Sequence, residues 1–274
     1  MSEALAVVLP DGVAELGCAL PALARLRAAG FTLHALAPAW AGGLLAASGD
    51  RVLVRSAGRG ATVAALRASG ARRGVLFDDR FSSALLLHRA GIAAVGHGGW
   101  RRWWVARVLP RDRRAHPVEA CWALAGAWCA DGATVPSTCT VPISGPAQAG
   151  LPAEYVVLVS TPGWPGRRLL VRLLAERLAV IGLGGCKAQP GLQLLNVEGA
   201  VAYLSVMAGA RVVIGADAGL LQLAALAGAR VVSVSGPGHL VEPRPWTRRV
   251  RPLGDAHGWP SVDAVAAAAL AEAA

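Results

Sequence analysis

The sequence predicts an α/β protein built from two doubly wound lobes. Short apolar strands alternate with helical segments of about ten residues along most of the chain, and this alternation favours parallel strands joined by right-handed crossovers. A chain of 274 residues with 54% hydrophobic content is long enough to bury two ordinary cores. Residues 132–153 are rich in Pro, Gly, Ser and Thr, and they predict the boundary between the lobes.

The first lobe is expected to alternate strands and helices from its first residues. We place strands at residues 4–9, 32–37, 51–55, 74–77 and 92–95, and helices at residues 14–29, 41–47, 61–69, 82–90 and 116–130. The second lobe begins with a strand at residues 155–159. We therefore expect domains at residues 1–145 and 146–274, with an Ala-rich terminal helix at residues 261–273 placed to pack back across the first lobe.

The most informative segment is residues 210–237. It predicts a strand, a tight turn, a helix and a strand, at residues 212–214, 215–219, 220–226 and 231–234. The first N–H groups of a helix have no intrahelical partner, and the helix dipole places partial positive charge there. The turn of Asp217, Ala218 and Gly219 is therefore a candidate phosphate site. Asp is also a preferred N-cap residue, which explains Asp217 without any ligand.

Composition narrows the partners and the compartment. The net charge of +10 comes almost wholly from arginine, since Lys187 is the only lysine, and it indicates phosphate-rich partners or an anionic membrane surface. The five cysteines show no framework spacing, and their odd number fits reduced thiols in the cytoplasm. The N-terminus lacks the features of a signal peptide, and no window reaches the roughly eighteen apolar residues that a membrane span needs.

Residues 100–114 combine six arginines and three tryptophans with a single acid, Asp112. Tryptophan favours the boundary between water and lipid, and clustered arginines attract anionic head groups or phosphorylated sugars. This pattern predicts docking to an anionic membrane or to the acceptor, and the candidate residues are Arg101, Arg102, Trp103, Trp104 and Arg107. The aromatic residues are alternatively the core of a loop. Nucleic acid is a weak third alternative, because no nucleic-acid-binding motif accompanies the segment.

Other motifs of catalytic or cofactor-binding proteins are missing from the sequence. The six histidines have no metal-ligand spacing, so we expect no metal site. The first strand is not followed by G-x-G-x-x-G, and no G-x-S-x-G elbow occurs. We expect neither a dinucleotide cofactor nor a hydrolase triad.

Three segments, in order along the chain, resemble the glycosyltransferase family 9 proteins, the lipopolysaccharide heptosyltransferase group. They are ELGCALPALARLRAAG from Glu15, TPGWPGRR from Thr161 and GADAGLLQLAALAGARVVSVSGP from Gly215, with a weaker match at FDDRFSSALLLHRAG and HPVEACWALAG. The resemblance implies a GT-B fold of two facing Rossmann-like lobes. It also implies inverting, metal-independent transfer of a sugar to a lipopolysaccharide-like or other glycan acceptor, with no cofactor. By the same resemblance the sugar is a heptose and the donor is ADP-heptose.

The resemblance assigns roles to residues of both lobes. Glu15 falls where the family has an aspartate that acts as general base, with Asp11 as a nearby alternative. Without that role, Glu15 simply favours the first turn of a helix, and Asp11 belongs to a Pro-Asp-Gly turn. In the second lobe the donor diphosphate is expected at Ser160, Thr161, Arg167, Asp217, Ala218, Gly219 and Gln222.

The donor segment departs from the family pattern at several positions. Arg167 stands where the family usually has lysine, Ala218 replaces threonine and Gln222 replaces histidine. The family's acid that reaches the nucleoside is missing, and Gln189 is its nearest substitute. These changes keep a second hypothesis open, a non-catalytic relative that binds a nucleotide or sugar phosphate. A nicotinamide-dependent enzyme on the same type of sheet is a third.

Overall fold

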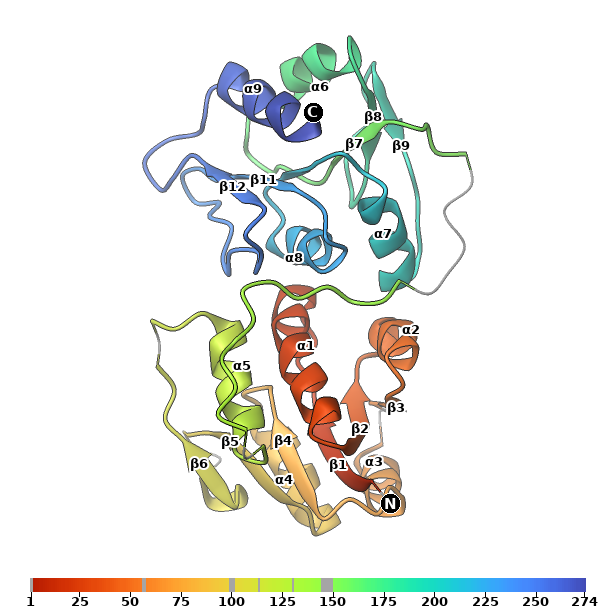
Figure 1. Cartoon of the computed structure of the whole chain (residues 1–274), viewed down its shortest axis with the longest axis vertical. Helices are drawn as coiled ribbons and strands as arrows, with labels where there is room; N and C mark the ends of the chain where they lie inside the picture. Colours follow the sequence, from red (N-terminus) through yellow and green to blue (C-terminus); the bar gives the residue numbers. More distant parts are fainter. Residues whose placement is uncertain (1, 56–57, 99–101, 113, 130, 144–149) are drawn as a thin grey trace. The chain divides into compact units, whose positions relative to one another are not determined.

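The chain divides into two compact units, Met1–Pro136 and Ser137–Ala274. The computed structural model describes residues 2–55, 58–98, 102–112, 114–129, 131–143 and 150–274. The division falls inside the Pro- and Gly-rich segment of residues 132–153. The expected boundary between residues 145 and 146 lies outside the described residues. Figure 1 colours the first unit from red to yellow-green and the second from green to blue.

The first unit is a parallel sheet covered by helices. Its strands, within the described residues, are β1 (Glu3–Val8), β2 (Phe31–Ala37), β3 (Arg51–Val54), β4 (Arg73–Leu76), β5 (Ala93–His97) and β6 (Arg107–Leu109). Its helices there are α1 (Val13–Ala28), α2 (Gly42–Ala47), α3 (Arg59–Ala68), α4 (Phe81–Ala90) and α5 (Pro117–Gly126), with 3-10 turns η1 (Ala39–Ala41) and η2 (Arg102–Trp104).

Strand order in this sheet is β3-β2-β1-β4-β5-β6, and every described pairing is parallel. Val7 of β1 pairs with Ala35 of β2 on one side and with Val75 of β4 on the other. The strand order therefore reverses between β1 and β4. In doubly wound sheets this reversal opens a crevice at the carboxyl ends of the two strands, where ligands bind.

The second unit repeats the same topology. Its strands, within the described residues, are β7 (Tyr155–Leu158), β8 (Ala179–Gly182), β9 (Leu192–Leu194), β10 (Val213–Gly215), β11 (Val231–Val234) and β12 (Val250–Leu253). Its helices there are α6 (Arg167–Ala175), α7 (Gly199–Ala208), α8 (Ala218–Leu226) and α9 (Val262–Ala273). The sheet order is β12-β11-β10-β7-β8-β9, so the reversal here lies between β7 and β10.

The core of each unit follows from strands buried on both faces. Residues from Leu5 to Leu9 are fully buried, as are those from Val156 to Val159, which is typical of parallel strands covered on both sides. The terminal helix α9 packs against α6, and its Val265 and Ala268 belong to the core of the second unit. The apolar face of this helix is therefore occupied within its own unit.

The structure confirms the predicted doubly wound α/β class and most of its elements. The strand predicted at residues 231–234 coincides with β11, and the others shift by one or two residues. The short edge strands β6 and β12 were not predicted. The helix predicted at residues 116–130 was wrong at residues 127–129, because the chain tightens there into three-residue turns, with Trp128 N–H donating to the Ala125 carbonyl. Residue 130 lies outside the described residues.

Among the helices of the described residues, none is both long and apolar enough to cross a membrane.

Candidate active site

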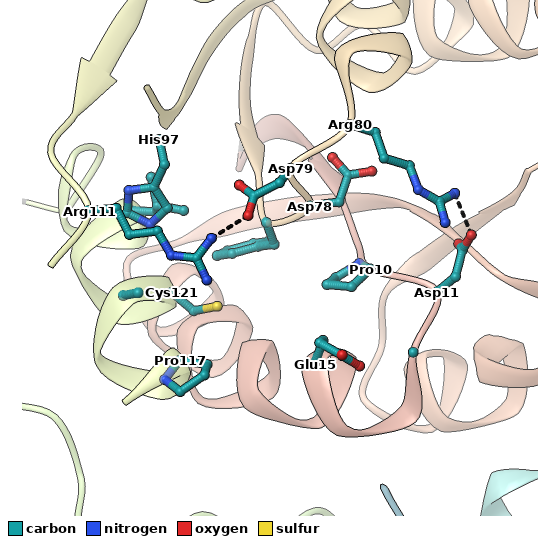
Figure 2. A pocket seen from close by; sticks show the side chains of 14 residues that line it. Pro10, Asp11, Glu15, Asp78, Asp79, Arg80, His97, Arg111, Pro117 and Cys121 are labelled. Carbon is teal, nitrogen blue, oxygen red and sulfur yellow. Dashed lines mark hydrogen bonds and ion pairs between the residues drawn. The ribbon is translucent and has the colours of Figure 1, made fainter. Parts of the chain in front are cut away.

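A cavity of about 410 Å³ lies at the carboxyl edge of the first sheet, where β1 and β4 end beside each other (Figure 2). The loop after β1 and the loop after β4 form its walls, together with α5. Its lining residues are Pro10, Asp11, Gly12, Glu15, Phe77, Asp78, Asp79, Arg80, His97, Arg111, Pro117, Ala120, Cys121 and Leu124. The place where the strand order reverses, here between β1 and β4, is called the switch point of the sheet. The predicted base, Glu15, therefore lines a cavity at the switch point of the first sheet.

Glu15 lies in the first turn of α1 and its side chain is exposed. The carboxylate folds back over the N-cap residue, because a Cβ built on Gly12 would lie only 1.9 Å from Oε2 of Glu15. Gly12 has extended backbone angles that other residues also adopt, so the glycine serves to leave room for this carboxylate. Within the part of the chain that the structure describes, no ion pair or hydrogen bond uses the Glu15 side chain.

Asp11, the alternative base, is in a different environment. Its carboxylate pairs with Arg80 (Figure 2), and its Oδ1 also lies 3.3 Å from Nη1 of Arg55. The backbone carbonyl of Asp11 also accepts a hydrogen bond of 3.2 Å from the Trp40 indole. Two arginines thus compensate the charge of Asp11, whereas Glu15 keeps its oxygen lone pairs available.

Arg55 follows β3 and connects the ends of three strands. Its Nη2 donates a hydrogen bond of 2.9 Å to the Leu9 carbonyl and lies 3.6 Å from Oδ2 of Asp78. Asp78 is almost completely buried after β4 and also accepts a hydrogen bond from the Ser83 hydroxyl. Arg55 therefore holds the loop after β1, which carries Asp11, against the loop after β4. The sequence analysis did not single out Arg55.

The thiols of Cys18, one turn after Glu15 on α1, and of Cys121, which lines the cavity, are both held in the neutral form. Burial raises the pKa of Cys18 to about 12, and the negative charge of Glu15 adds to this shift. Burial also raises the pKa of Cys121 on α5, with Cys18 contributing. A neutral thiol is a poor nucleophile, so Glu15 is the better candidate for chemistry in this cavity.

The second unit brings the ends of β7 and β10 close together. A Cβ on Gly215 would lie 2.1 Å from Cγ2 of Val159, so only glycine permits this approach without a shift. The Ala216 N–H then donates a hydrogen bond of 3.1 Å to the Ser160 carbonyl. Ser160 and the turn beginning at Asp217 are thereby adjacent, at the switch point of the second sheet.

Asp217 caps helix α8. Its Oδ1 accepts a hydrogen bond of 2.9 Å from the Leu220 N–H. The capping role of Asp217 is therefore real, and it satisfies one of the first N–H groups of α8. The N–H groups of Ala218 and Gly219 have no acceptor among the described residues. The turn thus keeps two donors at the positive end of the helix dipole.

Thr161 and Arg167 lie in the loop that connects β7 to α6. Thr161 is 6% exposed, and its hydroxyl has no hydrogen-bond partner in the described part of the chain. Arg167 is the first residue of α6, and no acidic partner is recorded for it among the described residues. Its positive charge opposes the effect of burial, which raises the pKa of Cys186. The loop after β7 therefore carries the unpartnered Thr161 hydroxyl, and the helix that follows this loop begins with the uncompensated guanidinium of Arg167.

Gln222 has a structural contact. It is 1% exposed, and its Oε1 accepts a hydrogen bond of 2.9 Å from the Trp246 N–H. This bond fixes the loop that precedes β12 and engages the amide oxygen. The side-chain oxygen and nitrogen of Gln189, in the loop after β8, are buried without a partner among the described residues.

His239 is a candidate that sequence reasoning missed. A Cβ on Gly163, which has a φ of +78°, would lie 2.9 Å from the His239 ring, so the imidazole covers the loop between Thr161 and Arg167. The ring also stacks on Trp259 with centroids 5.8 Å apart. The sequence could have indicated His239 through its position shortly after the strand at residues 231–234, because the loops after parallel strands meet at one edge of the sheet.

The predicted docking residues whose side chains the structure describes differ in their surroundings. Trp103 is 74% exposed, whereas Trp104 packs edge-on against Phe81 and His88, with ring centroids 6.2 and 4.8 Å away. Arg107 donates a hydrogen bond of 3.3 Å to the Ala127 carbonyl. Arg102 begins η2, and Arg101 lies outside the described residues. Among the described aromatic side chains of the set, Trp103 is therefore the more exposed.

The described residues contain no group of three or more His, Cys, Asp or Glu side chains arranged to hold a metal ion.

Comparison with known proteins identifies the fold. No model of a known protein family matches the sequence, and no curated protein sequence matches it significantly. Among solved structures, the E. coli heptosyltransferase WaaC with ADP aligns with a TM-score of 0.81 and 19% identity, over 99% of this chain and 100% of that one. E. coli ADP-heptose lipopolysaccharide heptosyltransferase II gives 0.76 and 20%, over 92% and 90%.

A third similar structure is the glycosyl transferase family 9 protein of Veillonella parvula. It aligns with a TM-score of 0.75 and 12% identity, over 92% of this chain and 86% of that one. The chain therefore has the two-lobe Rossmann-like fold of these glycosyltransferases, as the sequence motifs predicted.

The contacts of Arg55 predict that it stabilises the first unit. Arg55→Gln removes a cation that lies 3.6 Å from the buried Asp78 and a hydrogen bond to the Leu9 carbonyl, and we expect the free energy of unfolding to fall by about 2 kcal/mol. Chemical denaturation measures this change. Arg73→Gln is the matched control, because the pair between Arg73 and Glu3 is exposed and its loss is expected to cost less than about 1 kcal/mol. Equal losses in the two variants would contradict the role of Arg55.

Proposed function

We propose that this chain is an inverting glycosyltransferase that moves a sugar from a nucleoside-diphosphate donor to a hydroxyl group of a glycan acceptor. The observation that carries the proposal is the Glu15 carboxylate, which lines the cavity at the switch point of the first sheet with no partner among the described residues. The similarity of fold to solved glycosyltransferases supports it. Fold alone does not determine activity, so the proposal depends on the site.

Glu15 would act as the general base. Its carboxylate takes the proton of the acceptor hydroxyl while the hydroxyl oxygen attacks the anomeric carbon of the donor sugar. The bond from the anomeric carbon to the diphosphate breaks, and the diphosphate leaves with the electron pair. One displacement of this kind inverts the configuration at the anomeric carbon.

The second unit would hold the donor. The N–H groups of Ala218 and Gly219 and the Arg167 guanidinium can bind the diphosphate oxygens, and they stabilise the charge that develops on the leaving group. Arg167 would supply this stabilisation without a metal ion, and no cofactor is needed. The His239 ring lies against the same loop as Arg167 and is a further candidate donor.

The donor and acceptor are proposed from the similar structures. Two of them are E. coli WaaC with ADP and with ADP-2-deoxy-2-fluoro heptose, so we propose ADP-heptose as the donor. A lipopolysaccharide-core-like, lipid-linked acceptor fits the same group. The exposed Trp103, with Arg107 nearby in the chain, would then contact an anionic membrane from its cytoplasmic side.

A second candidate function is binding of a nucleotide or sugar phosphate without transfer. The engagement of Gln222 with the Trp246 N–H favours it, because this side chain replaces the histidine of the related enzymes and is occupied by a structural bond. Calorimetry distinguishes the two candidates. Tight ADP binding without turnover of ADP-, UDP- or GDP-sugars on any acceptor would support the second candidate and contradict the first.

Replacing the proposed base gives the direct test of the mechanism. In Glu15→Gln the side chain keeps its length but cannot take a proton, so kcat for sugar transfer should fall by roughly 100- to 10,000-fold, with donor affinity unchanged. Transfer assays and calorimetry with ADP measure the two quantities. Glu3→Gln, at the exposed start of β1, should retain full activity. A Glu15→Gln variant with normal kcat would remove Glu15 from the mechanism.

Gly12→Ala tests the position of the carboxylate and leaves its chemistry intact. The added methyl group would displace the Glu15 carboxylate from its place over the N-cap, so kcat should fall on the order of 100-fold while thermal stability falls no further than in a glycine-to-alanine change at another helix N-cap. Gly58→Ala is the control, because Gly58 is also an N-cap glycine, in α3, and its nearest contact would be 3.9 Å away. Full activity in Gly12→Ala would show that the observed carboxylate position is not needed for catalysis.

A further inference from the structure

A second cavity of the first unit lies along helices α3 and α4, and it shares no residue with the cavity of Glu15. Its volume is about 350 Å³, which is at the lower end of the range for ligand pockets. Its lining residues are Arg59, Gly60, Val63, Ala64 and Arg67 of α3, and Arg89 of α4. We call it the arginine groove. The proposed transfer reaction does not use it.

The charge of the arginine groove is unbalanced. Three of its six lining residues are arginines, and neither α3 nor α4 contains an acidic residue. Within the described residues, Arg59, Arg67 and Arg89 have no acidic partner. Other arginines of the unit do have one, namely Arg25, Arg27, Arg55, Arg73, Arg80 and Arg111. An anion in the groove would relieve the mutual repulsion of its three cations.

The sequence shows that this imbalance is local. Residues 51–111 contain twelve of the 27 basic residues but only two acidic ones, Asp78 and Asp79. This segment alone therefore has a net charge of +10, which equals that of the whole chain, while the rest of the chain is balanced. Asp78 and Asp79 both face arginines at the other cavity, through Arg55 and Arg111. The arginine groove belongs to the part of the segment that has no counter-charge of its own.

The groove has room for an anion, and one of its guanidinium groups is held in place. Arg67 Nη2 donates a hydrogen bond of 2.6 Å to the Arg89 carbonyl, which holds the Arg67 guanidinium at the end of α4 and leaves its other N–H groups available. Val63 and Ala64 are small, and a Cβ on Gly60 would meet nothing within 4 Å. The planar guanidinium binds two phosphate oxygens at once, so arginine suits phosphate groups better than lysine does.

We propose that the arginine groove binds a phosphorylated ligand with at least two negative charges, through Arg59, Arg67 and Arg89. The ligand is a soluble diphosphate or phosphomonoester, or the phosphate head group of an anionic lipid. The proposal stands whether or not the chain transfers sugars.

The test compares a groove variant with a control of equal charge. Inorganic pyrophosphate is titrated by calorimetry into protein saturated with ADP, so that any nucleotide site is already filled. The double variant Arg67→Gln/Arg89→Gln should bind pyrophosphate at least about tenfold more weakly than wild type. The control Arg51→Gln/Arg72→Gln removes the same charge at exposed positions outside the groove and should bind as wild type does.

A second arm of the test identifies the source of the phosphate. Flotation with phosphatidylcholine vesicles is compared with flotation with vesicles that also contain phosphatidic acid. Binding that the groove variant loses and the control keeps supports the groove, with pyrophosphate indicating a soluble ligand and phosphatidic acid a lipid head group. The proposal is overturned if wild type binds neither probe, if the groove variant binds as wild type does, or if the control loses as much affinity.

Discussion

Parallel pairing of six strands in the order β3-β2-β1-β4-β5-β6, repeated in the second unit, decides where the candidate functional side chains lie. Right-handed crossovers place every strand-to-helix loop at the carboxyl edge, and the reversal of order leaves a crevice there. In the first unit this constraint brings Glu15 to the loop that carries Asp78. In the second it brings Ser160 to the turn of Asp217. Neither pair is close in sequence.

The two switch points use opposite electrostatics on the same framework. In the first unit, arginines compensate the acids around the cavity, and Glu15 alone of the named acids, among the described residues, keeps its carboxylate unengaged. In the second unit, helix N–H groups, Arg167 and the unpartnered Thr161 hydroxyl present donors and positive charge. The first unit thus offers a base and the second unit offers an anion site, and sugar transfer from a diphosphate requires both groups.

Local patterns predicted the fold, because the alternation of strands and helices is a property of short segments. The edge strands β6 and β12 were missed, because they lack the apolar run of the central strands. The site was predicted less completely. Asp217 and Glu15 follow recognisable strands, but the role of Arg55 depends on the register that brings Leu9 and Asp78 to it. A short sequence pattern does not encode this register, because Arg55, Leu9 and Asp78 belong to three separate segments of the chain. His239 likewise reaches Gly163 only after the second sheet has formed.

Amide hydrogen exchange with and without ADP tests whether the turn of the second sheet holds a nucleoside diphosphate. We expect slower exchange in the presence of ADP at residues 160–168 and 217–220, because ligand oxygens would take up the N–H groups that now lack acceptors among the described residues. Unchanged exchange at both segments with saturating ADP, or protection confined to other parts of the chain, would contradict it.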